Sequence, residues 1–396
     1  MDQKRIAEAI EKLLSSRAEP LVLAKIGAPR PDALSALARG QFGAALQPLL
    51  ASEPEFANER RYWCYSFGFT ERFDVAVAAH YVARACEQMP PAGAVAALCR
   101  LLSTKRATGT CFSSLYGPSV QSPIELTPTL SIVPFDSVPD SAQKRRCHPV
   151  LEDLLPRVPL LRHAPTSVLA YSFAIDPVIG ESDSLIPRDF SAQLQHIHDA
   201  RTALNAAGRG VVFSGLEWTH FDDPDVNLAM SDSIRWTMHE IVPFMIHGLP
   251  LDATAAKAVV RGLLEFAESD KPRVIQAIDR LRNHRVRRQL HDKALELGIS
   301  YETILCDPDE WPGELTYRLS LRAARFMGES AKERANIRTM VRRLYAARSA
   351  AAHGATVSDP KGTDQLLVEA DEFLTKMIQR MLESRAIPRW TGFDIA

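Results

Sequence analysis

The pattern of apolar and polar positions divides the chain into three regions. In the first hundred residues the apolar positions recur at helical spacing over Arg5–Ser16, Asp32–Ala38 and the alanine-rich run Asp74–Leu102, which the pair Pro90-Pro91 interrupts. The segment RRYWCYSFGF at 60–69 has aromatic residues at alternate positions, which is the period of a strand. These patterns predict a mostly helical N-terminal segment with one strand region.

The texture changes between about residue 107 and residue 230, where proline and serine become frequent. Short β-rich segments replace the helical period, and turn-forming clusters separate them: IELTPTLSIVPF (124–135), SVLAYSFAI (167–175) and GVVFSGLEW (210–218). The prolines inside the first segment predict an edge strand or an irregular one, because proline cannot donate a ladder hydrogen bond. This stretch therefore predicts a small β or α+β module.

Beyond residue 230 the helical period returns and continues almost to the end. The predicted helices are 231–247, 253–268, 271–297, 314–327, 331–352 and 362–384. The predicted fold is mainly α, with a β-containing (α+β) middle module and a C-terminal all-α bundle. The predicted boundaries are 1–106, 107–230 and 231–396.

The composition indicates the cellular compartment. The six cysteines are scattered without a C-x-x-C pair, which is typical of free thiols in a reducing compartment. The opening MDQKRIAEAIEKLL is a charged amphipathic helix without the apolar core of a signal peptide. No run of about 18 apolar residues occurs that would span a membrane. We expect a cytoplasmic protein that does not enter a membrane.

Charge is distributed unevenly, although the net charge is only −1. Residues 271–350 carry 17 Lys/Arg against 10 Asp/Glu, so this stretch is basic and the remainder is acidic. The densest block is RLRNHRVRRQLHDK at 280–293, in which Arg285 and Arg288 are candidate contacts for an RNA backbone. A solvated helix face explains the same block equally well.

Three other patterns carry little functional signal. The pair His196 and His198 shares a face only on a strand, and no third metal ligand is evident. The acidic stretch 221–232 contains Asp-Pro-Asp, which is more typical of a turn than of a cation site. The glycines of AAGRGVV at 206–212 precede a strand, whereas a phosphate loop precedes a helix. We therefore expect no metal and no cofactor.

The helix predicted at 331–352 has clear ends. Ser330 and Glu333 form a capping box, in which the serine hydroxyl accepts the N–H of Glu333 while the glutamate reaches back. Gly354 can adopt the left-handed conformation that ends a helix. His353 is therefore expected at the C-terminal end.

An arginine interrupts the apolar stripe of this helix. At about 100° per residue, Arg348 falls in the middle of the stripe formed by Ile337, Val341 and Leu344. A buried guanidinium must be paired, or must face a cleft or a partner subunit. Arg338 and Arg342, with Arg334, lie toward one flank of the helix, where phosphate or solvent can meet them.

His353 lies about 140° around the helix from Arg348, so the two side chains diverge on a regular helix. They can converge if the helix unwinds at His353-Gly354, or if two copies of the helix meet across a two-fold axis. The spacing itself is weak evidence, because three Arg/His pairs have it: Arg157/His163, Arg285/His291 and Arg348/His353. Only the third joins a stripe-breaking arginine to a capped helix end.

This part of the sequence resembles the HEPN superfamily of nucleic-acid-associated helical domains, whose signature is R-x(4–6)-H, and within it the ApeA-like branch. The resemblance covers about 273–354, over RVIQAIDRLRNHRVRRQLHDKALELGISYETIL, GELTYRLSLRAARFMG and IRTMVRRLYAARSAAAHG. It implies a C-terminal all-α HEPN-like bundle. Members are often metal-independent ribonucleases, frequently toxins or phage-defence effectors, that act as dimers.

Residue by residue, the resemblance makes Arg348 and His353 the catalytic pair. It places Ser349 at the position after the arginine, where active members often carry a polar amide or an acid. Glu314 and Arg318 match an acidic-x3-basic feature, and an ordinary i, i+4 ion pair explains them equally well. RNA is then the expected partner, and a homodimer through the 331–352 helix the expected assembly.

The chemistry of this pair suits RNA cleavage by the neighbouring 2′-hydroxyl. Histidine titrates near neutrality and can act as base or acid, whereas the arginine fork stabilises negative charge on phosphate oxygens. Two alternatives stay open. Arg348 can instead pair with a buried carboxylate such as Glu302 while His353 only ends the helix. The domain can also be a non-catalytic dimerisation module, or a module that binds nucleic acid or a nucleotide, with an N-terminal sensor region.

Overall fold

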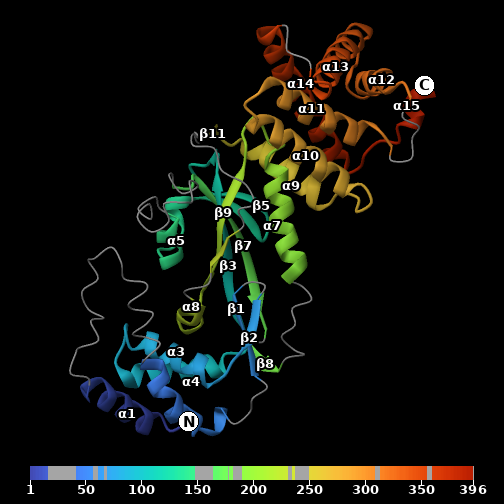
Figure 1. Cartoon of the computed structure of the whole chain (residues 1–396). Coiled ribbons are helices and arrows are strands. Elements are labelled where there is room, and N and C mark those ends of the chain that lie inside the picture. Colours follow the sequence, from blue (N-terminus) through green and yellow to red (C-terminus); the bar gives the residue numbers. More distant parts are fainter. Residues whose placement is uncertain are drawn as a thin grey trace.

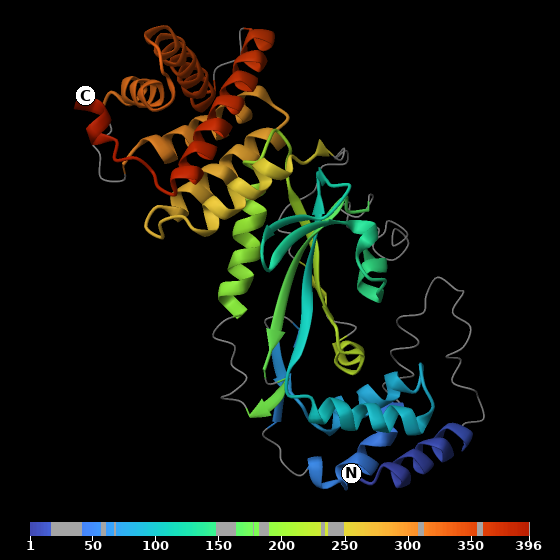
Figure 2. The ribbon, with the colours of Figure 1, turned by 180° about the vertical axis from the view of Figure 1, so that it is seen from behind.

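The molecule is elongated, with helices at both ends and a sheet between them (Figures 1 and 2). The computed structural model describes residues 1–16, 42–56, 61–66, 69–147, 164–176, 178–181, 190–230, 234–236, 249–307, 313–354 and 359–395. The predicted helix Asp32–Ala38 and the pair Arg157/His163 lie outside these residues. The prediction of a mainly α chain with a β-containing middle module is confirmed.

The N-terminal end consists of helices that pack beside a small sheet. The helices are α1 (Gln3–Ser16), a helical stretch at 42–51, the short 3-10 turn η1 (Pro54–Phe56), α3 (Val75–Ala85) and α4 (Pro91–Ser103). The predicted interruption at Pro90-Pro91 is confirmed. Pro91 occupies the first turn of α4, where a backbone N–H has no partner within the helix, so the lack of an N–H in proline costs no hydrogen bond.

The predicted strand at 60–69 is a hairpin. It forms β1 (Arg61–Ser66) and β2 (Phe69–Arg72), and β1 also pairs with β8 (Ile179–Glu181). The N-terminal segment and the middle module therefore share one three-stranded sheet, so the predicted boundary at residue 106 separates no independent units.

The middle module is built on an antiparallel six-stranded sheet of order β10-β9-β3-β7-β6-β5. Its elements are β3 (Ala107–Tyr116), β4 (Pro118–Ser119), β5 (Ile124–Thr127), β6 (Leu130–Pro134), η2 (Phe135–Ser137), α5 (Ala142–Arg146), β7 (Ser167–Ile175), α7 (Phe190–Leu204), β9 (Phe213–Phe221), α8 (Pro224–Met230) and β10 (Ile234–Trp236). The prediction for 167–175 is confirmed. The segment 124–135 forms the β5–β6 hairpin, whose pairing is irregular between Glu125 and Thr127. β5 lies at the sheet edge but contains no proline, whereas Pro134 is the last residue of β6, which lies between β5 and β7.

The two faces of this sheet are covered by different helices. One face carries an apolar cluster that includes Phe112, Trp218 and Cys147, the C-cap residue of α5. The other face meets α7, where Arg201 donates to the Ser214 hydroxyl at 2.7 Å. That long helix also contacts the C-terminal helices, so it joins the sheet to the end of the molecule (Figure 1).

The boundary predicted at residue 230 is too early, and the helix predicted at 231–247 is wrong at its start. Ile234–Trp236 instead forms the edge strand β10, because these residues pair with β9. Residues 237–248 lie outside the described part. A second link, β11 (Leu249–Pro250), pairs in parallel with β4, and only then does Asp252 cap the first C-terminal helix.

The C-terminal unit is an all-α bundle. Its helices are α9 (Ala253–Leu264), α10 (Lys271–Val286), α11 (Leu290–Leu305), α12 (Leu315–Met327), α13 (Ala331–Ala352), α14 (Pro360–Ser384) and α15 (Thr391–Ile395). The single helix predicted over 271–297 is wrong. The chain turns at residues 287–289 and α11 packs against α10, with Ser300 donating to the carbonyl of Ala277 at 2.7 Å.

The last residues of the chain belong to this core. The guanidinium of Arg322 is fully buried and forks onto Asp394 of α15, with Nε–Oδ1 and Nη2–Oδ2 distances of 3.0 and 2.5 Å. Trp390 is also fully buried, and its indole N–H donates to the carbonyl of Ile304 at 2.8 Å. These bonds fasten the chain end to α11 and α12.

Candidate functional site

Helix α13 has the ends that its sequence predicts. The Ser330 hydroxyl accepts the N–H of Glu333 and the Glu333 carboxylate returns to the N–H of Ser330, so the capping box is confirmed. His353 is the C-cap, and Gly354 follows with a φ of +70°. The helix lies at the outer end of the bundle, and only Met340, Val341 and Leu344 of its 22 residues are buried.

Arg348 occupies the apolar stripe because α11 makes room for it. A Cβ on Gly298 would lie 2.4 Å from the Cγ of Arg348, so only glycine admits the stem of this side chain. One turn further along α11, Glu302 meets the guanidinium, with an Nε–Oε1 distance of 3.1 Å and an Nη2–Oε2 distance of 3.3 Å. Arg348 therefore lies between two helices with its charge paired.

The pair of Arg348 and Glu302 is not sealed from water. Their side chains remain 26% and 23% exposed. The alternative that Arg348 pairs with Glu302 is therefore correct about the partner, whereas the carboxylate is partly open to solvent. Only Nη2 of Arg348 makes a hydrogen bond within the described chain. Nε is buried beside Glu302 as an ion-pair contact without a hydrogen bond, and Nη1 makes no hydrogen bond there.

Tyr345 completes this cluster. The guanidinium of Arg348 lies over its ring, 5.5 Å from the centroid. Burial, together with the negative charge of Glu302, raises the pKa of Tyr345 to about 12. The phenol therefore stays protonated near neutral pH and can donate a hydrogen bond to the carboxylate.

His353 and Ser349 lie on a different side of the helix from Arg348. His353 is exposed, and its backbone N–H donates to the carbonyl of Ser349 at 3.2 Å. Because α13 stays regular as far as Ala352, the helix does not unwind in time to bring His353 toward Arg348. Of the two ways to unite the pair, only the approach of a second copy is compatible with this geometry.

Glu314 and Arg318 lie at the beginning of α12. Glu314 is the N-cap residue, in the left-handed region with a φ of 54°, and is exposed. The N–H of Arg318 donates to the carbonyl of Glu314 at 3.1 Å, which is a bond of the first helical turn. This geometry makes both residues part of the helix start.

The four candidate RNA-binding arginines have different environments. Arg342 and Arg288 are exposed, and Arg338 is half-buried with its guanidinium 5.5 Å from the ring centroid of Tyr317. Arg285 is only 7% exposed, and its environment is a buried junction. The prediction that Arg285 contacts RNA is therefore wrong, whereas the other three remain available.

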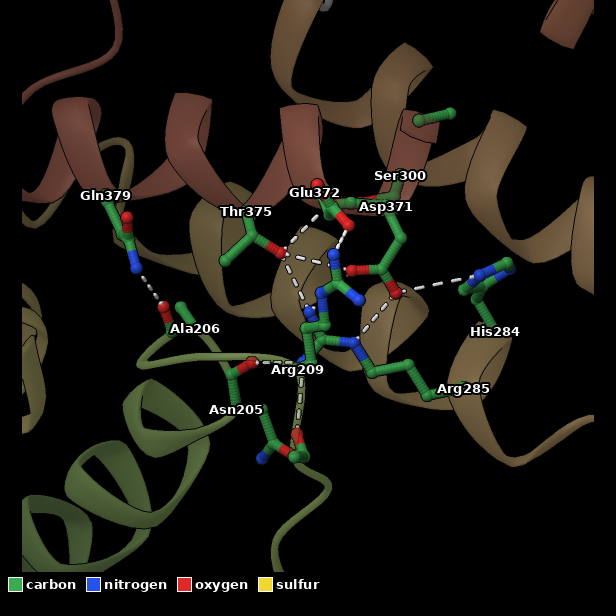
Figure 3. A network of polar contacts seen from close by, with 12 residues as sticks. Asn205, Ala206, Arg209, His284, Arg285, Ser300, Asp371, Glu372, Thr375 and Gln379 are labelled. Atoms are coloured by element: carbon green, nitrogen blue, oxygen red, sulfur yellow. Dashed lines mark hydrogen bonds and ion pairs between the residues drawn. The ribbon is translucent and has the colours of Figure 1, made fainter. Parts of the chain in front are cut away.

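The junction around Arg285 joins the C-terminal unit to the middle module (Figure 3). Arg285 forks onto Asp371 of α14 at 2.7 and 2.8 Å and donates to the hydroxyl of Thr375 at 2.7 Å. Its remaining N–H groups donate to the carbonyls of Asn205 and Gly210, at 2.7 and 3.0 Å, in the loop after α7.

Other polar contacts surround this junction. Gln379 donates to the carbonyl of Ala206 at 2.8 Å, and Arg209 forms an ion pair with Glu372 (Figure 3). The segment 206–212, which carries the glycines set aside as a phosphate loop, is therefore a structural connection. The second Arg/His pair, Arg285/His291, is not available to a ligand, because the side chain of Arg285 is hydrogen-bonded within this junction.

Two further features concern ions and membranes. In the described part of the chain, no group of three or more His, Cys, Asp or Glu side chains is arranged to hold a metal ion. His196 and His198 both lie on helix α7, where alternate residues point in different directions. None of the described helices combines the length and the apolar character needed to cross a bilayer.

Comparison with known proteins finds no relative. No family model matches the chain, and neither the curated proteins nor the solved structures contain a match. The candidate site therefore stands on its own geometry and on the resemblance seen in the sequence.

Three residues of the site were not predicted from the sequence. Gly298 looks like a weak point in a helix, although the spacing GISYE places it one turn before Glu302. Tyr345 and Tyr317 look like ordinary aromatic positions. An i, i+3 relation between Tyr345 and Arg348 is the one local sign that the two side chains meet.

Proposed function

We propose that the C-terminal unit is an HEPN-type, metal-independent endoribonuclease that acts as a homodimer through α13. The observation that supports it most is the solvent-accessible Arg348, with His353 at the capped end of the same poorly covered helix. The resemblance of residues 273–354 adds the reaction class. A toxin or phage-defence effector role belongs to the same proposal.

The reaction would proceed by attack of a ribose 2′-hydroxyl on the adjacent phosphorus, with departure of the 5′-oxygen. One His353 would take the proton of the 2′-hydroxyl, and His353 of the second copy would give a proton to the leaving oxygen. Arg348 would stabilise the charge that develops on the phosphorane oxygens. The products are a 2′,3′-cyclic phosphate and a free 5′-hydroxyl.

Glu302 fits this scheme as a positioning residue. It holds the Nε and Nη2 edge of Arg348, so the guanidinium keeps a fixed plane while its Nη1 remains for a phosphate oxygen. Tyr345 supports the other side of the same plane. Such an arrangement would hold the guanidinium in place and leave some of its N–H groups to donate to a ligand.

Cleavage assays with matched histidine variants test this function. The purified chain, incubated with RNA in EDTA, should release products ending in 2′,3′-cyclic phosphate, and His353→Ala should reduce the rate by at least about 100-fold. His291→Ala is the matched control, because His291 is also exposed and also follows an arginine at this spacing. Equal cleavage by the two variants would discard the assignment.

A second candidate function has an observation in its favour. Arg348 is anchored by Glu302 and points away from His353, as expected of a non-catalytic dimerisation or nucleic-acid-binding module that serves an N-terminal sensor region. This module would form a stable dimer by light scattering and leave RNA intact. A mobility-shift titration against salt would then decide whether nucleic acid is its ligand.

A further inference from the structure

The hairpin formed by α12 and α13 carries a high density of positive charge. Residues 315–352 contain nine Lys/Arg and only two Asp/Glu. Some of these arginines are held internally: Arg322 by Asp394, Arg325 by the carbonyl of Phe393, Arg334 by the carbonyl of Gly328 and Arg348 by Glu302. Lys332, Arg342 and Arg343 are exposed, and Arg338 is half-buried.

Three arginines of α13 account for most of that surface charge. Arg342 and Arg343 are exposed and Arg338 is half-buried, and none of them has an acidic partner in the described part of the chain. The Nε of Arg338 is buried and has no hydrogen-bond partner among the described residues. Intramolecular ion pairing therefore does not explain their presence.

Arg338 lies over an exposed aromatic ring. Its guanidinium is 5.5 Å from the ring centroid of Tyr317, and Tyr317 is 45% exposed, one of three large apolar side chains among the described residues that are exposed to this degree. Because the ring is exposed, packing in the hydrophobic core does not explain it. An arginine stacked on an exposed aromatic is, however, a common surface for a nucleobase.

This platform is aligned with Ser349 and His353. Along α13, Arg338, Arg342, Tyr345, Ser349 and His353 follow one another at steps of three or four residues, which places them on one flank of the helix. The helical rise puts Arg338 and His353 about 22 Å apart along the axis. Figure 1 shows α12 beside α13. Tyr317 of α12 meets Arg338, the residue of this flank that is furthest from His353.

We propose that this flank, defined by Tyr317, Arg338, Arg342, Ser349 and His353 and called here the RNA track, binds single-stranded RNA and leads it to His353. The choice of RNA rests on the proposed function. The choice of a single strand rests on Tyr317, because an exposed ring needs an unpaired base to stack on, and a duplex hides its base faces. Arg342 would fork onto a phosphate between the platform and His353.

Binding can be measured without cleavage. Full-length chain carrying His353→Ala would be titrated, in EDTA and low salt, with a fluorescein-labelled single-stranded RNA and with the matched duplex, by anisotropy. Single strand should bind more tightly than duplex. Tyr317→Ala should weaken single-strand binding by roughly 5- to 100-fold, whereas Tyr317→Phe keeps the ring and should bind like the parent.

Two more variants complete the design. Arg342→Ala should weaken binding and lower the slope of log affinity against log salt by about one. Val368→Ala is the matched control, because Val368 is equally exposed at 45% and lies on α14 away from the track. It should leave the affinity unchanged.

Each outcome separates this proposal from the nuclease assignment. If Tyr317→Ala binds single-stranded RNA as well as its parent, or if duplex binds equally well, the RNA track is wrong even when the unmodified chain cleaves RNA. If the unmodified chain leaves RNA intact but binding still depends on Tyr317, the nuclease assignment fails and the RNA track stands.

Discussion

Two arginines of the C-terminal unit, Arg285 and Arg348, illustrate two uses of the same side chain. Each is paired with a carboxylate, and each precedes a histidine by five or six positions. Arg285 makes five hydrogen bonds, and its side chain is 7% exposed (Figure 3). Arg348 meets one carboxylate and is 26% exposed.

The difference shows that bonding capacity, and not sequence spacing, separates a structural arginine from a candidate functional one. All the side-chain nitrogens of Arg285 already donate to protein oxygens, so no phosphate can be bound there. Arg348 makes one side-chain hydrogen bond among the described residues, and its Nη1 makes none. Its partner Glu302 fixes the guanidinium without enclosing it.

The largest expected effect is on the junction. Asp371→Ala would leave Arg285 buried without its carboxylate, and breaking a buried pair in this way lowers the free energy of unfolding by about 3–5 kcal/mol. Urea denaturation measures it. Glu265→Ala removes the partner of Arg385 in an exposed pair and should change stability by less than about 1 kcal/mol. Similar losses of stability in Asp371→Ala and Glu265→Ala would contradict the distinction between a buried and an exposed ion pair.

A smaller effect is expected where Arg348 passes Gly298. Gly298→Ala places a methyl against the arginine stem, and the overpacking costs about 1–3 kcal/mol, of which better helix propensity returns about 1 kcal/mol. The net loss should be up to about 2 kcal/mol by thermal or urea unfolding. Gly43→Ala, where the nearest atoms are 3.7 Å away, should instead be neutral or stabilising. A stabilised Gly298→Ala would show that the stem is not held there.

The smallest effect concerns pH at the junction. Burial lowers the pKa of His284, although the nearby Asp371 opposes the shift and Arg285 and Lys293 add to it. Because the folded pKa lies below the unfolded value of about 6.5, stability is complete above that pH and falls as the solution is acidified toward the folded pKa.

A titration isolates this residue. The Nδ1 of His284 lies 2.9 Å from the carbonyl of Lys293, so His284→Asn can keep a donor there while removing the titrating ring. Urea midpoints measured between pH 8 and pH 5.5 should fall less steeply for His284→Asn than for the parent. Parallel curves would mean that His284 does not contribute.

Local signals predicted the parts of the fold that depend on neighbouring residues. The capping box and Gly354 fixed both ends of α13, and Pro90-Pro91 placed the break before α4. The turn at 287–289 contains no glycine or proline, so the continuous period of 271–297 concealed it. Strand β10 depends on the available edge of β9, which no local pattern records.

The site divides in the same way. Arg348 stood out because its position on the stripe is local, and Glu302 was a reasonable partner one helix away. The burial of Arg285 depends on carbonyls 75 and 80 residues earlier in the chain, in the loop after α7. A basic block such as 280–293 therefore cannot be divided into surface and interior residues before the packing is known.

Helix α15 has a practical consequence for handling the molecule. Removing its final turn would strip the carboxylate from a guanidinium that water cannot reach, because Asp394 is the acid on which Arg322 forks. The strain would fall on α12, the helix that also carries Tyr317. Trimming what looks like a dispensable tail would thus disturb the very surface that an RNA-binding experiment sets out to measure.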